Sequence, residues 1–188
     1  MPMRLSKTVL LCAFPFLLYS CKSGFEHNKA GMEKLNKELK EEFGPEAWYT
    51  SIELANSGSS DDVVTVDQTK DPNSLKQEQW SQFHGFWDKK ADITLSIQGA
   101  EPKSFMFQLD KEVSLSKLGE LIELSQKKLA TEQDAGDSQL ILAQIKASTQ
   151  MNTKAEGIYY SISLESKKKK KSYNFVYNLD GSLKALNQ

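Results

Sequence analysis

The feature that most constrains the fold is the recurrence of apolar residues at every second position near the C-terminus. Every second side chain is apolar in residues 158–164, and the same pattern recurs in residues 173–179. Because successive side chains of a strand point to opposite faces, each segment predicts a strand with one buried face. Asp180-Gly181 is a turn signal before a last short strand at residues 183–186. The chain is therefore expected to build a sheet with one face against a core.

Two segments have the spacing of amphipathic helices. The first covers residues 29–43 and ends at Gly44-Pro45, and the second begins near residue 115. Apolar side chains recur every three or four residues in both, with polar and charged residues between them. The positions assigned to the buried faces are Met32, Leu35, Leu39 and Phe43 in the first helix, and Leu118, Leu121, Ile122, Ser125 and Leu129 in the second.

Residues 75–87 are interpreted as a third, shorter helix. Pro72-Asn73-Ser74 has the composition of a helix start, and Ser74 and Gln77 are spaced as a capping box. Gly85 interrupts the segment. The residues that suggest helical spacing are Leu75, Trp80, Phe83, His84 and Trp87.

Further segments are expected to be strands. Residues 48–55 and 63–69 are assigned to two of them, and residues 93–97 and 105–109 to a hairpin around residues 99–102. In the first strand, one face carries Trp48, Thr50, Ile52 and Leu54, and the other carries Tyr49, Ser51 and Glu53. Residues 140–148 are also assigned to a strand, because Ile141, Ala143, Ile145 and Ala147 alternate, although Leu142 breaks the pattern.

Together these segments predict an α+β fold, with an antiparallel sheet and helices on one of its faces. A unit of one helix and two or more strands would be repeated about three times, from starts near residues 29, 75 and 115. We expect a single domain over residues 29–188, which is enough chain to bury a core. Neither cysteine falls in that range, so the domain is expected to fold without a disulfide. We also expect it to be a monomer.

The N-terminus has the pattern of an export signal. Arg4 and Lys7 precede an apolar run over residues 9–19. That run is shorter than the roughly 18 residues that a membrane-spanning helix needs. It ends in Leu18-Tyr19-Ser20-Cys21, which resembles the lipobox of bacterial lipoproteins: an aliphatic residue, a small residue before the cleavage site, and then cysteine. Tyr19 departs from the residues usual at its position.

This resemblance implies that residues 1–20 are a signal peptide and that cleavage leaves Cys21 as a diacylated N-terminus. Residues 21–28 would then be a lipidated tether between the domain and the membrane. Lys22 stands where aspartate would direct inner-membrane retention, which favours the outer membrane, facing the periplasm more than the cell surface. The alternative is an ordinary secretory signal that ends near a cysteine by chance.

Charge and side-chain chemistry argue against several functions. Without the signal the chain carries 22 lysines, 25 acidic residues and no arginine. Because arginine makes the commonest specific base contact, we expect no nucleic-acid partner. The sequence has no Gly-x-Ser-x-Gly elbow and no glycine-rich phosphate loop, and its two histidines, His27 and His84, cannot form a His-Glu-x-x-His zinc site.

We therefore expect no metal, no cofactor and no enzymatic activity. The expected function is that of a membrane-anchored envelope lipoprotein that binds a protein, peptide or glycan. A periplasmic hydrolase or modifying enzyme that uses carboxylates is the alternative, because carboxylates are plentiful in the sequence.

Two surface candidates follow. Trp80, His84, Phe86 and Trp87 suggest an aromatic platform for a sugar ring, lipid or peptide, although aromatic residues at helical spacing more often pack into a core. The run Lys167, Lys168, Lys169, Lys170 and Lys171 is typical of a solvated hairpin tip. It is also a candidate contact for an anionic surface, such as lipopolysaccharide or the headgroups of the anchoring leaflet.

Overall fold

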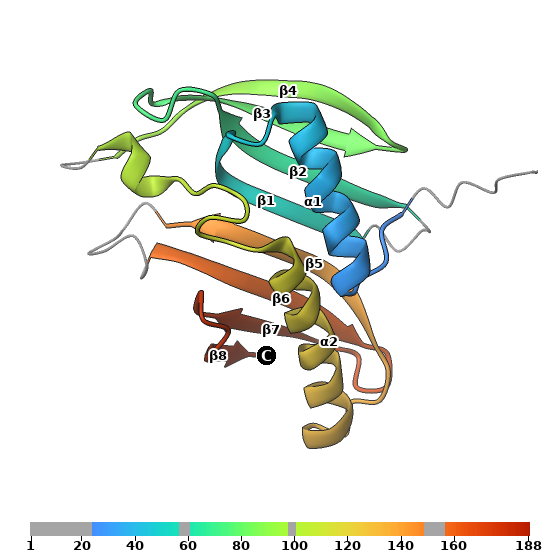
Figure 1. The fold of residues 1–188 in the computed structure, drawn as a ribbon. Helices are drawn as coiled ribbons and strands as arrows, with labels where there is room; N and C mark the ends of the chain where they lie inside the picture. Colours follow the sequence, from blue (N-terminus) through green and yellow to red (C-terminus); the bar gives the residue numbers. More distant parts are fainter. Residues whose placement is uncertain (1–23, 57–60, 98–100, 149–156) are drawn as a thin grey trace, which may run out of the picture.

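The computed structural model describes residues 24–56, 61–97, 101–148 and 157–188, which form an eight-stranded antiparallel sheet with two helices on one face (Figure 1). The elements follow the order α1 (Lys29–Phe43), β1 (Trp48–Asn56), β2 (Asp62–Thr69), β3 (Lys76–Phe83), β4 (Phe86–Thr94), the 3-10 turn η1 (Pro102–Phe105), α2 (Leu115–Glu132), β5 (Ser138–Ala147), β6 (Ile158–Ser166), β7 (Lys171–Tyr177) and β8 (Leu183–Asn187). In space the strand order is β4-β3-β2-β1-β5-β6-β7-β8.

The sheet consists of two halves with the same plan. In each half one helix is followed by four strands, and the first strands of the two halves, β1 and β5, pair antiparallel at the centre. The predicted α+β class, with helices on one face, is confirmed. The predicted repeat of three helix–strand–strand units is wrong, because the described residues contain two α-helices, each followed by four strands.

The helix predicted over residues 75–87 is wrong. This segment forms the hairpin of β3 and β4, in which Gln82 pairs with Trp87 and Phe83 with Phe86. His84 and Gly85 have φ angles of 52° and 79°, the left-handed pair that a two-residue hairpin turn requires. Ser74 does not cap a helix, and its side chain accepts a hydrogen bond from the backbone of Lys76 in the loop before β3. Tryptophans seven residues apart fit helical spacing, but here they lie on two strands.

The hairpin predicted from residues 93–97 and 105–109 is also wrong. β4 continues to Thr94 and pairs with β3 instead. Pro102 begins the 3-10 turn η1, and Phe107 then forms an isolated bridge with Tyr49. Alternation in this stretch therefore reflects one strand end and one bridging segment rather than two paired strands.

A β-bulge in the first strand of each half changes which side chains reach the core. The bulge between Tyr49 and Ser51 places Tyr49 in the core cluster that contains Ile52 and Leu54, although alternation predicts Tyr49 on the other face. In β5, a bulge between Leu140 and Leu142 leaves Leu140 1% exposed and Ile141 36% exposed. The strand predicted at residues 140–148 is confirmed, and the bulge explains its broken pattern.

Both long helices predicted from the sequence are confirmed, with side chains that cap their first turns. Asn28 accepts a hydrogen bond from the backbone of Gly31, and Ser114 accepts one from Lys117. The two helices touch at Gly119, where an added Cβ would lie 2.5 Å from the carbonyl oxygen of Asn28. The helices therefore cover the sheet as one layer over the core.

Candidate functional site

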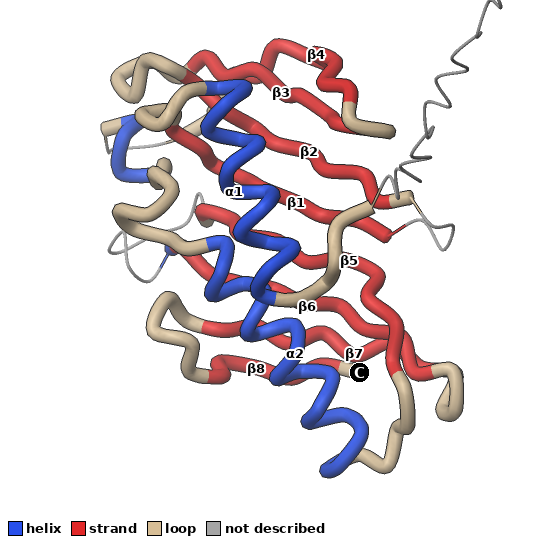
Figure 2. Tube along the Cα trace, turned by 45° about the vertical axis from the view of Figure 1, so that its right-hand side comes forward, coloured by secondary structure: helices blue, strands red, loops and turns tan. Residues whose placement is uncertain are grey.

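Both helices lie on one face of the sheet (Figure 2). The other face carries mostly polar side chains, with the apolar Val63, Leu142 and Val176 among them. We call this surface the open face. Its residues alternate along the strands with the core positions and come from both halves of the sheet. Members in the middle of the surface are Glu53, Thr65, Asp67, Gln79, Ser81, Gln144, Lys146, Ser161, Ser163 and Asn174.

Neighbouring strands exchange side-chain hydrogen bonds across the open face. In the N-terminal half the Thr65 and Ser81 hydroxyls lie 3.1 Å apart, and Gln79 donates to the Asp67 carboxylate at 2.9 Å. In the C-terminal half Ser161 and Ser163 both donate to the side-chain oxygen of Asn174, at 2.9 and 3.2 Å. These bonds hold hydroxyl and amide groups in fixed positions on a surface without helices.

Three charged side chains lie near the centre of the open face, namely Glu53, Asp67 and Lys146. Lys146 Nζ lies 3.6 Å from Glu53 Oε1, and the same oxygen accepts a hydrogen bond from Ser51. Burial raises the pKa of the Asp67 carboxyl, the hydrogen bond from Gln79 lowers it, and the nearby Glu53 charge raises it. An ionised Asp67 is therefore less favourable in the folded protein than in water.

The open face is not hollowed into a site for a small molecule. The cavity at one end of it has a volume of about 130 Å³ and is lined in part by Asp67, Lys146 and Phe105. Sites for drug-sized ligands are typically about 300–1,000 Å³ and enclose most of the ligand. The geometry of this surface suits a partner that is itself broad and flat.

The structure separates the four aromatic candidates of the sequence into two groups. Trp80 and Trp87 point toward the helices, with ring centroids 5.8 and 5.0 Å from that of Phe43. His84 and Phe86 lie at the β3–β4 turn instead, where Phe86 is 79% exposed. The four side chains therefore do not form one platform.

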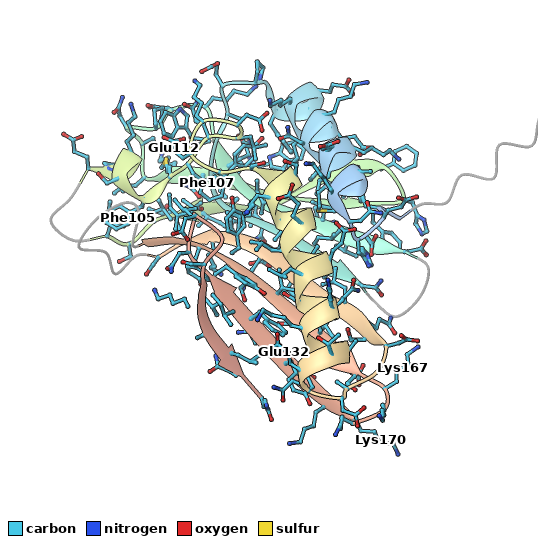
Figure 3. All side chains as sticks on the ribbon, turned by 60° about the horizontal axis from the view of Figure 1, so that its bottom comes forward. Phe105, Phe107, Glu112, Glu132, Lys167 and Lys170 are labelled. Carbon is cyan, nitrogen blue, oxygen red and sulfur yellow. The ribbon has the colours of Figure 1, made fainter. Side chains whose placement is uncertain are left out.

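The lysine run lies at the tip of the β6–β7 hairpin, as its composition predicts. Residues 167–170 form the turn and Lys171 begins β7, and Figure 3 shows Lys167 and Lys170 beyond the end of α2. Lys168 pairs with Asp134 at 2.6 Å, and this ion pair lowers the pKa of the Asp134 carboxyl. All five lysines are exposed.

An imidazole–carboxylate pair joins the N-terminal segment to the sheet. His27 Nε2 lies 2.9 Å from Asp62 Oδ1, and the backbone N–H of Phe25 donates to Asp62 Oδ2 at 2.8 Å. Ser138, which lines a cavity with His27, has a hydroxyl oxygen without accessible surface or a hydrogen-bond partner. That hydroxyl cannot meet a substrate in this arrangement, and both oxygens of Asp62 are used to hold the chain.

Within the described ranges, no group of three or more His, Cys, Asp or Glu side chains is arranged to hold a metal ion. Neither described helix has both the length and the apolar character that crossing a membrane requires. Cys21 and the rest of the lipobox lie outside the described residues.

Sequence reasoning missed the open face as a candidate surface. The signal was present in the polar positions of the predicted strands, which carry serine, threonine, asparagine and glutamine more often than lysine or glutamate. Comparisons with protein-family models, with curated proteins and with solved structures find no match for this chain.

Proposed function

We propose that this chain is a lipid-anchored protein of the bacterial envelope that acts by binding a protein partner on its open face. The sequence of the lipobox supports the anchor at Cys21, with the outer membrane as its location and the periplasm as the side it faces. The observation that supports binding is the eight-stranded sheet itself, which has helices on one face and ordered polar groups on the other.

A protein partner fits this surface better than a small ligand does. Ordered hydroxyl and amide groups offer hydrogen bonds over many strands, whereas the cavity on this face holds only about 130 Å³. On the open face, the small cavity disfavours the alternative of a carboxylate-based hydrolase, because Glu53 does not line it together with Asp67. A larger cavity of about 530 Å³ is lined in part by Asp71, Glu78 and Asp92, and it would be the site for that alternative.

The anchor is tested by mass spectrometry of protein isolated from envelopes. We expect a diacylated Cys21 at the mature N-terminus. Cys21→Ala should leave the precursor uncut and abolish its partition into detergent. An unmodified Cys21 thiol in envelope-derived protein would contradict the anchor, whatever the open face does.

The binding surface is tested by photocrosslinking in intact envelopes, with the full chain carrying a crosslinking residue at Ser163. We expect one reproducible protein adduct, which disappears when Gln144→Arg is added. The matched control is Lys37→Glu, on the solvent side of α1, which should leave the adduct unchanged. An adduct made equally well with Gln144→Arg would overturn the assignment to this face, and an adduct that resists protease would identify a glycan instead.

A further inference from the structure

Several chain segments that are distant in sequence meet at one end of the sheet. Asn56, the last residue of β1, pairs with Asp62, the first residue of β2. Ser138, the first residue of β5, pairs with Ser166, the last residue of β6. The side chain of Gln139 reaches Asn56 at 3.4 Å, which places both positions at the same end. The β3–β4 turn and the β6–β7 turn lie there as well (Figure 2). We call this region the anchor end.

The N-terminal segment of the domain is fixed to the anchor end. Asp62, which is only 5% exposed, binds both the backbone of Phe25 and the ring of His27. The segment also passes very close to the first turn of α1, because an added Cβ on Gly31 would overlap the carbonyl oxygen of Glu26. The chain from Phe25 onward is therefore part of the folded body.

This attachment leaves little chain between the fold and the proposed lipid. Cys21 precedes Phe25 by four residues, and an extended chain spans at most about 3.6 Å per residue. A lipid on Cys21 would thus hold the backbone of Phe25 within roughly 14 Å of the membrane interface. The anchor end must then lie near the leaflet, whatever conformation the connecting residues adopt.

Beside the N-terminal segment, the lysine turn has a fixed backbone. The Lys170 N–H donates to the carbonyl of Ser166 at 2.8 Å, and the Lys169 N–H donates to the Ser166 hydroxyl at 3.0 Å. His27 and Lys167 line the same cavity of about 400 Å³, so the turn adjoins the segment that leads to Cys21. Four of the five lysines have no ion pair with any described residue, while Lys168 is paired with Asp134.

Toward the opposite edge of the sheet, the β3–β4 turn exposes two aromatic rings. Phe83 and Phe86 are cross-strand partners and are 47% and 79% exposed. Four steps separate β3 from β6 in the sheet, or roughly 19 Å at the usual strand spacing of about 4.8 Å. Asp62, which binds the N-terminal segment, is on β2 between the two turns.

We infer that the anchor end is a membrane-contact surface, in which the lysine turn binds anionic phospholipid headgroups and Phe83 and Phe86 enter the interface. Lysine side chains near an anionic leaflet are attracted to it, and exposed aromatic rings gain from burial among the acyl chains. Of the acidic groups at this end, Asp134 is paired with Lys168, Asp61 lies 3.8 Å from His84, and Asp137 lines the cavity beside Lys167, so the attraction depends on the local charge of the lysine turn. The inference rests on the proposed anchor at Cys21 and adds the orientation of the domain.

The test uses the mature lipidated protein, reconstituted in vesicles of phosphatidylcholine alone or of phosphatidylcholine with phosphatidylglycerol. Cleavage by lysyl endopeptidase is followed at the lysine turn and, as a control, at Lys111. Lys111 is an exposed lysine in another turn, and it forms an ion pair with Glu46 as Lys168 does with Asp134. We expect anionic vesicles to slow cleavage at the lysine turn at least tenfold and to leave cleavage at Lys111 unchanged. High salt should restore the cleavage, because it screens the attraction. Equal cleavage of the lysine turn in both kinds of vesicle would overturn the inference.

A second measurement does not depend on the protease. Amide hydrogen exchange of residues 82–87 should slow by a factor of about three or more on anionic vesicles. Lys→Gln at residues 167, 169 and 170 should remove that protection, although these lysines are distant from the aromatic turn. Thermal melting in detergent should be the same for the variant and the parent, which establishes that the variant folds. Protection that survives the substitutions would contradict a surface shared by the two turns. Mass spectrometry of Cys21 on the same sample separates failure of the anchor from failure of this inference.

Discussion

In the N-terminal half, α1 packs on the sheet through aromatic rings, whereas in the C-terminal half α2 is joined to it through tyrosine hydroxyls. Phe43, at the end of α1, contacts the rings of Tyr49, Trp80 and Trp87 edge-on. By contrast, the Tyr177 hydroxyl lies 2.8 Å from that of Ser125 in α2, and Tyr160 accepts a hydrogen bond from the backbone of Ser114.

The two halves differ in the side chains that join helix to sheet, whereas their order of elements and the positions of their bulges are the same. Each half has a bulge early in its first strand and a second bulge where its third strand pairs with its fourth. Aromatic contacts tolerate some sliding between the helix and the sheet, whereas a buried hydroxyl bond fixes one position. The Tyr49 hydroxyl emphasises the contrast, since it is buried in the N-terminal half without a hydrogen-bond partner.

Loss of the Phe43 ring should have the largest effect. Phe43→Ala would remove one ring from three aromatic contacts and leave a cavity beneath α1, at a cost of about 4 kcal/mol in the free energy of unfolding. Urea denaturation measures this cost. The matched control is Phe86→Ala, whose ring is 79% exposed and whose loss should cost little. Equal costs for the two variants would show that α1 does not depend on the aromatic contacts.

Gly119→Ala tests the point at which the two halves meet through their helices. The new methyl group would lie 2.5 Å from a backbone oxygen of Asn28, so one helix must shift. We expect a loss of about 2–3 kcal/mol in the free energy of unfolding, again measured with urea. Glu123→Ala, at an exposed position of the same helix, serves as the control for helix propensity. A neutral Gly119→Ala would mean that the helices are free to separate.

Removing three tyrosine hydroxyls one at a time sharpens the comparison of the halves. Tyr160→Phe and Tyr177→Phe should each cost about 1 kcal/mol, because a part-buried or buried partner loses its hydrogen bond. Tyr49→Phe should be neutral or slightly stabilising, because it removes an unpaired buried hydroxyl. Thermal melting of the three variants, measured under the same conditions, ranks their stabilities. If Tyr49→Phe lowered stability as much as the other two variants, the tyrosine hydroxyls of the two halves would not differ in their contribution to stability.

The smallest expected effect concerns the open face. Burial raises the folded-state pKa of Asp67, so the ionised carboxylate lowers stability at neutral pH, and the cost disappears as pH falls through that pKa. Asp67→Asn should therefore raise the melting temperature slightly at pH 7, with the difference shrinking in acid. A lower melting temperature at pH 7 would show that the carboxylate contributes a favourable interaction.

Much of the fold was predictable wherever one periodicity dominated a segment. Residues 29–43 and 158–164 bury one helix face and one strand face, and both were assigned correctly. Prediction failed at Trp80 and Trp87, because two strands joined by a left-handed turn placed aromatic residues at helical spacing. It also failed at Tyr49, because a bulge reverses alternation and leaves no clear mark in the sequence.

The candidate surfaces were predictable only in part. The position of the lysine run at a hairpin tip could be predicted from its composition, because five consecutive like charges do not fit inside a sheet core. The open face and the anchor end both depend on pairings between distant strands. Nothing near Phe86 in the sequence indicates that its turn lies at the same end of the sheet as Lys167.

The central pairing of β1 with β5 has a consequence for how the chain folds. It joins Ser51 to Lys146, 95 positions apart, whereas every other pair of adjacent strands is consecutive in the sequence. Hairpins within each half close short loops, and their entropic cost is correspondingly small. The pairing of β1 and β5 must close a far longer loop, so we expect it to come late and to limit the folding rate. Until it forms, each half carries an unpaired strand edge, and this is the stage at which chains that are still folding would be most prone to associate with one another.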